Sequence, residues 1–187
     1  AVISLVWGIN DSVSIPWQIP FGRLSLEMDP LSALFALAIL FVSLLAAVFG
    51  SGYLKHYEGK KNIGIHWFFF NLLVASMLLV VVARNGLLFL LAWEVMSLSS
   101  FFLVVFEHEK ESVRKAGWTY FVAAHIGTAF LLAMFLLLGR QGGSLGFSSF
   151  MSHGLTGRPA TVVFLFAVVG FGTKAGFMPL HVWLPEA

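Results

Sequence analysis

Residues 86 to 106 read GLLFLLAWEVMSLSSFFLVVF and carry one charged side chain, Glu94, near the middle. An α-helix rises about 1.5 Å per residue, so a segment of this length crosses the ~30 Å hydrocarbon core of a membrane. An apolar run this long is typical of a membrane-spanning helix and not of a strand. We therefore expect a transmembrane helix with an ionisable group near mid-bilayer.

Four other apolar segments have the same character. They lie at residues 31–50, 63–83, 118–138 and 160–183. The chain is 59% hydrophobic and 11% charged, with a mean hydropathy of +0.91, whereas soluble domains carry roughly 25% charged residues. We predict an all-α fold, a polytopic transmembrane bundle of about five spanning helices over residues 31–187. Residues 1–30 are expected to form an extended or hairpin cap outside the membrane.

Lysine and arginine divide unevenly between the two sets of loops. One side collects Lys55, Lys60, Lys61, Lys110, Arg114 and Lys115, and the other has Arg23, Arg84, Arg140 and Arg158. Cytoplasmic loops of membrane proteins carry the excess of basic residues. This distribution favours a cytoplasmic location for the first side and an extracytoplasmic N-terminal segment.

The composition also excludes several classes of site. The chain has no cysteine, which rules out thiolate-held iron–sulfur clusters, disulfides and cysteine-type zinc sites within it. A net charge of +2 is too small to suggest binding to nucleic acid. We expect no cofactor and no metal in this chain.

Glu94 is the first candidate functional residue. A charged side chain at mid-bilayer costs about 2.5–3.5 kcal/mol on insertion scales, so such residues usually face a cavity or a partner. Ser97 and Ser100 lie on the same side of the helix and extend Glu94 into a polar stripe. We expect a role in ion translocation. The alternative is a structural carboxylate that is hydrogen-bonded between helices.

Lys174 is the second candidate, in the stretch GFGTKAGFMPL at residues 170–180. Gly172, Gly176 and Pro179 surround it, and proline lacks the N–H that a continuous helix needs. The last helix is therefore expected to break around Lys174–Pro179. The freed backbone groups must then line a cavity or be buried in protein.

A lysine at this depth calls for a compensating charge. We expect Glu94 and Lys174 to form a buried pair, because making and breaking such a pair changes the affinity of each group for a proton. The alternative is that Lys174 extends along the helix to the cytoplasmic interface, as lysines near helix ends can do.

Two histidines are candidate proton relays. His125 shares a helix face with Thr128 and titrates near neutral pH, and His181 lies close to the end of the last segment. The alternative for His125 is a simple hydrogen bond between helices. A haem held by His66 and His125, as in a cytochrome-b-like subunit, is disfavoured because their depths differ by about 6 Å.

Three motifs resemble one known family. FGTKAGFMPLHVWLPEA (171–187) resembles the lysine-bearing broken helix of the antiporter-like subunits of respiratory complex I, multisubunit Na+/H+ antiporters and membrane-bound NiFe hydrogenases. LLAWEVMSLSSFFLV (90–104) resembles the glutamate-bearing helix of that family, and MDPLSALF (28–35) the start of its third helix. The resemblance covers residues 25–187 and is closest in style to hydrogenase-4 and formate hydrogenlyase.

The resemblance implies roles for these residues. Glu94 would be the carboxylate and Lys174 the central lysine of one proton half-channel, and the five helices would be the third to seventh of the family. The family's first two helices and the segments after its seventh have no counterpart within these 187 residues. The chain would therefore hold at most half of a pathway.

The resemblance also implies a setting. The protein would be a proton- or cation-translocating subunit of a redox-driven complex in a bacterial or archaeal inner membrane, with no catalytic chemistry of its own. Its partners would be membrane lipid, other antiporter-like and small membrane subunits, and a soluble redox module that carries iron–sulfur clusters, with or without a NiFe site. The alternative is a haem-free structural anchor for that module.

Overall fold

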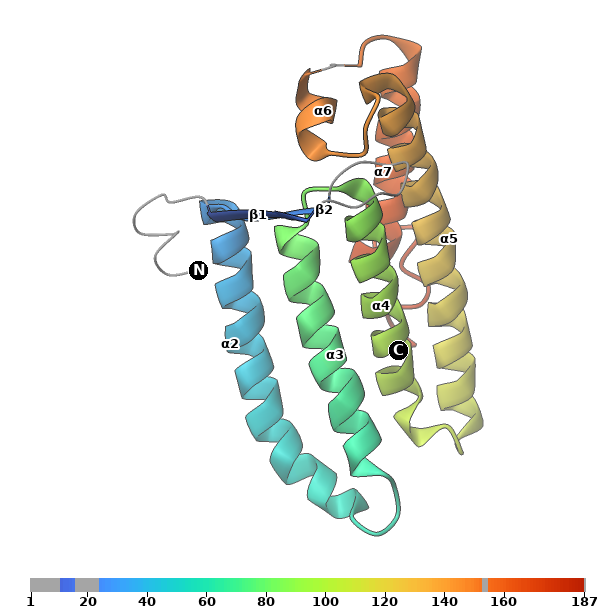
Figure 1. The fold of residues 1–187 in the computed structure, drawn as a ribbon. Coiled ribbons are helices and arrows are strands. Elements are labelled where there is room, and N and C mark those ends of the chain that lie inside the picture. The colour runs from blue at the N-terminus through green and yellow to red at the C-terminus, as the bar shows by residue number, and fades with distance from the viewer. Residues whose placement is uncertain (1–10, 16–23, 153–154, 187) are drawn as a thin grey trace.

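The fold is a bundle of long helices. The computed structural model describes residues 11–15, 24–152 and 155–186. Among these, five helices are long and apolar enough to cross a membrane: α2 (Pro30–Tyr53), α3 (Ile63–Val82), α4 (Gly86–Val104), α5 (Glu111–Gly142) and α7 (Arg158–Ala175). Figure 1 shows α2 at one edge of the bundle and α5 with α7 at the other. The predicted transmembrane helix bundle is confirmed.

A two-stranded sheet lies at one end of the bundle. Strands β1 (Asp11–Ile15) and β2 (Leu24–Met28) pair antiparallel, with Asp11 opposite Met28, as expected of a hairpin. In Figure 1 the strands lie where α2 begins and α3 ends. The rest of the expected cap, residues 1–10 and 16–23, is outside the described residues. Three short helices complete the described elements: η1 (Leu54–Tyr57), η2 (Val105–Glu107) and α6 (Phe147–Ser152).

The start of α2 is tied to the turn between α3 and α4. Asp29 caps α2 by accepting a 2.6 Å hydrogen bond from the backbone N–H of Ser32, and Pro30 suits the first helical turn. The other carboxylate oxygen of Asp29 accepts a 2.5 Å hydrogen bond from the guanidinium of Arg84. Arg84 also donates its backbone N–H to the carbonyl of Ser25 in β2. One arginine therefore joins the sheet, α2 and the α3–α4 turn.

The tight α3–α4 connection agrees with the sequence. Arg84 and Asn85 are the polar break between two apolar segments, and the side chain of Asn85 accepts hydrogen bonds from the backbone N–H groups of Leu87 and Leu88. This cap lets α4 begin at once, and α3 packs against α4 more extensively than any other pair of elements.

The hydrophobic core lies between α4, α5 and α7. Its buried centre is formed by Leu90, Trp93, Met96, Leu131, Met134, Phe135 and Leu145. Helices α5 and α7 come into close contact at two glycines, Gly127 and Gly170. A Cβ atom added at Gly170 would lie 2.5 Å from the side chain of Leu131 and 3.1 Å from the carbonyl of Gly127. Small residues at a crossing allow such close approach of membrane helices.

Two helices differ in length from the prediction. Helix α5 covers Glu111–Gly142, where the apolar run predicts residues 118–138. Hydropathy detects only the part of a helix within hydrocarbon, and the added N-terminal turns carry Glu111, Arg114 and Lys115, which favour helix in water. Helix α7 ends at Ala175, well before the expected residue 183.

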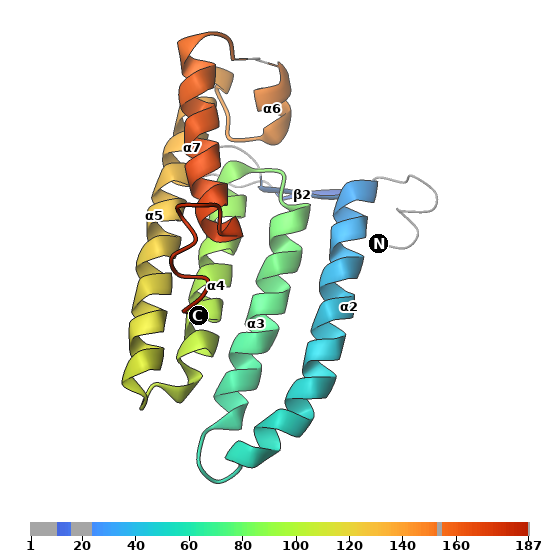
Figure 2. The same cartoon turned by 180° about the vertical axis from the view of Figure 1, so that it is seen from behind.

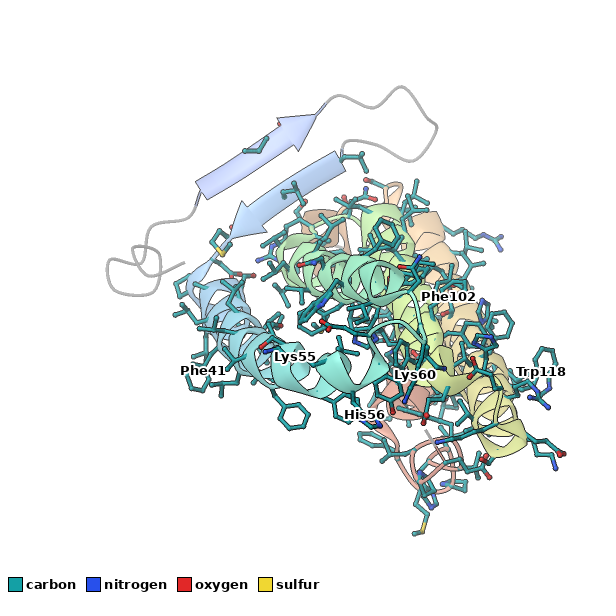
Figure 3. The ribbon with its side chains drawn as sticks, turned by 90° about the horizontal axis from the view of Figure 1, so that it is seen from below. Phe41, Lys55, His56, Lys60, Phe102 and Trp118 are labelled. Atoms are coloured by element: carbon teal, nitrogen blue, oxygen red, sulfur yellow. The ribbon has the colours of Figure 1, made fainter. Side chains whose placement is uncertain are left out.

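The bundle exposes apolar side chains on its sides and basic ones at one end. Figure 3 views it from the end with the α2–α3 connection, and Phe41 and Trp118 point outward from the bundle there. These two side chains are 64% and 66% exposed, and Phe102, which stacks on Phe69 of α3, is 46% exposed. Lys55 and Lys60 lie at the end nearest the viewer. This pattern is what a lipid-facing bundle with a basic end requires.

Candidate functional site

Helix α7 ends part of the way along the length of the bundle and does not reach the far end of α5. Figure 2 shows α7 stopping part of the way along α5, after which the chain continues beside α4 and α5 without a long helix. The Gly127–Gly170 contact holds α7 against α5 just before this point. Lys174, the penultimate residue of α7, is thereby placed between helices in the middle of the bundle.

Gly176 ends α7. Its φ of 74° is in the left-handed region that glycine adopts without strain. The backbone N–H of Phe177 donates to the carbonyl of Gly172 at 2.8 Å and that of Gly176 to the carbonyl of Thr173 at 3.3 Å, which is a Schellman motif. The predicted helix break is confirmed. The α-helix ends at this glycine, within the predicted Lys174–Pro179 stretch.

A tryptophan satisfies a backbone group that the break frees. The carbonyl of Thr173 accepts a 2.7 Å hydrogen bond from the indole N–H of Trp183. The ring of Trp183 also packs edge-on against Tyr120 of α5, with ring centroids 5.2 Å apart. The segment after the break is therefore fixed to both α7 and α5, as irregular backbone at membrane depth requires.

Lys174 has a partner on α5. Its ammonium donates a 2.7 Å hydrogen bond to the hydroxyl of Tyr120, a residue that is 3% exposed. The ammonium therefore points into the bundle. This geometry disagrees with the alternative in which Lys174 extends to the interface.

Glu94 has a different partner. Its carboxylate lies 3.5 Å from Nε2 of His125 on α5, and the contact becomes an ion pair when the imidazole is protonated. The other ring nitrogen, Nδ1, lies 2.8 Å from the carbonyl of Phe121. The two side chains are 30% and 40% exposed, respectively, within this chain. His125 is thus brought to Glu94, as a relay would need.

The structure does not show the buried Glu94–Lys174 pair expected from the sequence. Among the described residues, no ion pair joins these two groups, and both side chains are half-buried. The reason is helix geometry: α5 lies between them, and its side chains Tyr120 and His125 take the two partners separately.

The remaining candidate residues divide into two groups. Ser100 and Thr128 donate to carbonyls of their own helices, those of Met96 and Ala124, and link no helices. Ser97 is buried, and its hydroxyl has no hydrogen-bonding partner among the described residues. The ring nitrogen Nδ1 of His181 is also buried and also has no hydrogen-bonding partner among the described residues. His181 lies after the break, near Gly176.

Sequence reasoning missed Tyr120 and Trp183. Both are amphipathic residues whose polar atoms need a partner when buried. A signal for Tyr120 was present, because it lies on the α5 face marked by Gly117, Ala124 and Gly127, residues small enough to admit another helix. No comparable signal marks Trp183, because its partner is a carbonyl freed by the tertiary structure.

An open pocket adjoins Lys174. It has a volume of about 960 Å³ and apolar walls that include Phe89, Trp93 and Phe171. Its other polar lining residues are Asp29, Ser32 and Arg84, from the end of the bundle that carries the strands. The pocket therefore lies between Lys174 and residues at that end of the described structure.

Two family models match the sequence. One, described as NADH:quinone oxidoreductase/Mrp antiporter, TM, matches residues 83–187. The other, described as NADH-Ubiquinone oxidoreductase (complex I), chain 5 N-terminus, matches residues 17–69. The first model contains Glu94, His125 and Lys174 within its range.

Individual proteins show the same similarity. The chain is 44% identical over 167 residues to hydrogenase-4 component B of Escherichia coli, covering 89% of this chain and 25% of that protein. It is 31% identical over 168 residues to NADH-quinone oxidoreductase subunit L of Buchnera aphidicola subsp. Schizaphis graminum. That match covers 87% of this chain and 27% of the relative. A chain of the Mrp complex from Dietzia sp. has the same fold, with a TM-score of 0.85 over 98% of this chain and 20% of that chain at 22% identity.

The chain spans about a quarter of the length of these curated relatives. The match to the first family model covers more than half of the chain. It includes both helices that carry the candidate charged residues, α4 with Glu94 and the broken helix α7 with Lys174. This protein therefore belongs to the NADH:quinone oxidoreductase/Mrp antiporter transmembrane family.

Proposed function

We propose that the chain is part of an antiporter-like membrane subunit that translocates protons or other monovalent cations, with Glu94 and Lys174 as its titratable groups. One observation carries the proposal. Glu94, His125, Tyr120 and Lys174 lie on three adjacent membrane-spanning helices and contact one another in two pairs across α5. Ionisable groups are costly at this depth, so a set of them on neighbouring helices is typical of an ion pathway.

The chemistry of the set fits proton transfer. Glu94 and His125 are an acid and a base 3.5 Å apart, and a small movement brings them within hydrogen-bonding distance. Lys174 holds a proton that the Tyr120 hydroxyl stabilises by accepting a hydrogen bond. His181, beyond the helix break, is the further relay candidate. The pocket beside Lys174 offers one approach for an ion.

The driving force and the partners are part of the proposal. Relatives are named as a hydrogenase-4 component and as an NADH-quinone oxidoreductase subunit. We infer a complex in which other antiporter-like and small membrane subunits surround this one, and a soluble redox module with iron–sulfur clusters supplies the energy. The basic end of the bundle, with Lys55 and Lys60, is assigned to the cytoplasmic side of a cell inner membrane.

Substitution of Glu94 tests the function. The full-length protein in its native complex is reconstituted into vesicles with an internal pH dye and supplied with the electron donor of that complex. Glu94→Gln keeps the shape and removes the titration, so we expect assembly and electron transfer to continue while proton movement falls by about tenfold or more. Glu111→Gln is the matched control, because Glu111 is an exposed carboxylate paired with Lys115.

A structural anchor gives the opposite result. A subunit that only held a redox module in the membrane would assemble and pump at the wild-type rate with Gln at position 94. That outcome would reject the translocation function for this carboxylate and favour the anchor.

A further inference from the structure

The hydroxyl of Tyr120 connects two helices. It accepts a hydrogen bond from the ammonium of Lys174 on α7 at 2.7 Å and donates one to the backbone carbonyl of Ser97 on α4 at 3.3 Å. Tyr120 itself is on α5 and is almost fully buried. A single side chain therefore joins the lysine to the helix that carries Glu94.

The Ser97 hydroxyl marks a polar site at the same junction. Ser97 is 2% exposed, and its Oγ atom has no hydrogen-bonding partner among the described residues. Two neighbouring serines on α4 behave differently. Ser99 and Ser100 donate to the carbonyls of Val95 and Met96, one turn back in the same helix, at 2.7 and 2.9 Å.

A buried hydroxyl without a partner is costly, because it has given up its hydrogen bonds to water and gained none from the protein. Buried water molecules bind where they satisfy such groups and reach several polar atoms at once. The carbonyl of Ser97 is bonded to Tyr120, which in turn accepts from Lys174, so the unpartnered hydroxyl belongs to the residue that meets the Tyr120–Lys174 pair. The unpartnered hydroxyl, the Tyr120 hydroxyl and the Lys174 ammonium are the kinds of polar group that a buried water satisfies.

We propose that Ser97 and Tyr120 hold a water molecule next to Lys174, and that Tyr120 is the positioning residue for the Lys174 ammonium. This rests on the proposed translocation function and extends it to two residues. When Lys174 releases its proton, the proton passes from Nζ to this water, which leaves a neutral amine and a hydronium ion. Ser97 is one turn from Glu94 on α4, so the water lies on the Glu94 side of the lysine.

A structure of the full-length protein in its complex tests the site directly. Cryo-electron microscopy at a resolution that shows ordered water is expected to place a water within hydrogen-bonding distance of Ser97 Oγ and of Tyr120 or Lys174. Finding Ser97 Oγ bonded to the carbonyl of Trp93, with no water beside it, would overturn the proposal.

Two variants test the role. Ser97→Ala removes the hydroxyl that would hold the water. Tyr120→Phe removes the phenolic hydroxyl but keeps the aromatic ring that packs on Trp183. We expect each to assemble and to lower proton movement about tenfold or more in the vesicle assay. Each is also expected to lose an infrared O–H band that shifts when ordinary water is replaced by heavy-oxygen water. Loss of a water band separates this role from a merely structural one.

The chain offers a matched control for each variant. Ser99→Ala removes an equally buried hydroxyl on the same helix that bonds only to its own backbone. Tyr53→Phe removes an exposed phenolic hydroxyl that lies 3.2 Å from the hydroxyl of Tyr57, far from Lys174. Both are expected to keep the wild-type transport rate and the water band.

The outcomes distinguish this inference from the function on which it rests. If Lys174→Met abolishes proton movement while Ser97→Ala and Tyr120→Phe keep the wild-type rate and band, the water site is wrong and translocation stands. If Lys174→Met itself transports at the wild-type rate, the translocation role of Lys174 fails, and the inference fails with it.

Discussion

The ammonium of Lys174 lies 2.7 Å from the hydroxyl of Tyr120, a residue on another helix that is almost completely buried. This contact fixes the direction of the lysine. The side chain turns towards α5 and the interior, although it is at the end of its helix, where lysines commonly extend to the headgroups. Two features make the contact possible, the close approach of α5 and α7 at their glycines and the end of α7 at Gly176.

The glycine contact is expected to be intolerant of a methyl group. In Gly170→Ala the new Cβ atom would lie 2.5 Å from the Leu131 side chain, and Leu131 is fully buried and has little room to move. We expect a loss of stability of about 1–3 kcal/mol, measured as a lower midpoint of thermal unfolding in detergent. Gly52→Ala is the control, because nothing lies within 4 Å of a Cβ atom there. Equal midpoints for the two variants would contradict the close packing of α5 on α7.

The indole of Trp183 is expected to stabilise the helix break. Trp183→Phe removes the N–H that bonds to the carbonyl of Thr173 and keeps an aromatic ring against Tyr120. The carbonyl would keep only the longer 3.3 Å bond from the backbone N–H of Gly176, so we expect a loss of stability of about 0.5–1.5 kcal/mol. Thermal unfolding compares this variant with Trp118→Phe, at a position that is 66% exposed. A midpoint no lower for Trp183→Phe than for Trp118→Phe would argue against this role.

The contact between Asp29 and Arg84 is expected to make stability depend on pH. Ser32, first through its backbone N–H and then through its side chain, and after it Arg84 lower the pKa of Asp29 below its usual 3.8. Since the folded state favours the ionised carboxylate, the stabilisation is complete above about pH 3.8 and is lost as the pH falls through the folded pKa.

Asp29→Asn keeps the capping oxygen and removes the charge. We expect wild type to exceed this variant by roughly 0.5–1 kcal/mol at neutral pH, because the carboxylate is about one-third exposed and its pairing is screened. The difference is expected to close in acid. Unfolding midpoints between pH 7 and pH 3 measure it, with Glu58→Gln as an exposed control. A difference that stayed constant over this range would contradict the ionic contribution.

His125 is expected to assist Glu94. His125→Gln keeps hydrogen-bonding capacity and removes the titrating ring, so proton movement in the vesicle assay should fall several-fold while the complex still assembles. His108→Gln is a close control, because His108 lies 3.8 Å from Glu109 in an exposed loop. Unchanged transport in the His125 variant would leave that residue a structural partner of Glu94.

Much of the fold follows from the sequence because the membrane makes simple demands. A span needs a long apolar segment, and Asp29, Asn85 and Gly176 mark where helices begin or end. The extra turns of α5 escape a hydropathy reading because they lie outside the hydrocarbon. The break after Lys174 is predicted from Gly172, Gly176 and Pro179, and the structure has α7 end at Gly176.

The site is harder to predict because its contacts join distant segments. Glu94 and Lys174 stand out as charges in apolar runs, and pairing them is the simplest way to balance both. The structure instead places His125 beside one and Tyr120 beside the other. Which side chains meet depends on how α5 is rotated between α4 and α7. A single helical pattern does not contain that rotation, whereas the small residues on α5 hint at it.

The most direct test of the translocation function is the effect of Lys174 on proton movement. The full-length protein in its reconstituted complex is compared with Lys174→Met and with Lys115→Met, which removes an exposed lysine paired with Glu111. We expect the Lys174 variant to transfer electrons and to lose proton movement by about tenfold or more, and the Lys115 variant to match wild type. Wild-type proton movement without the Lys174 ammonium would contradict the proposed function.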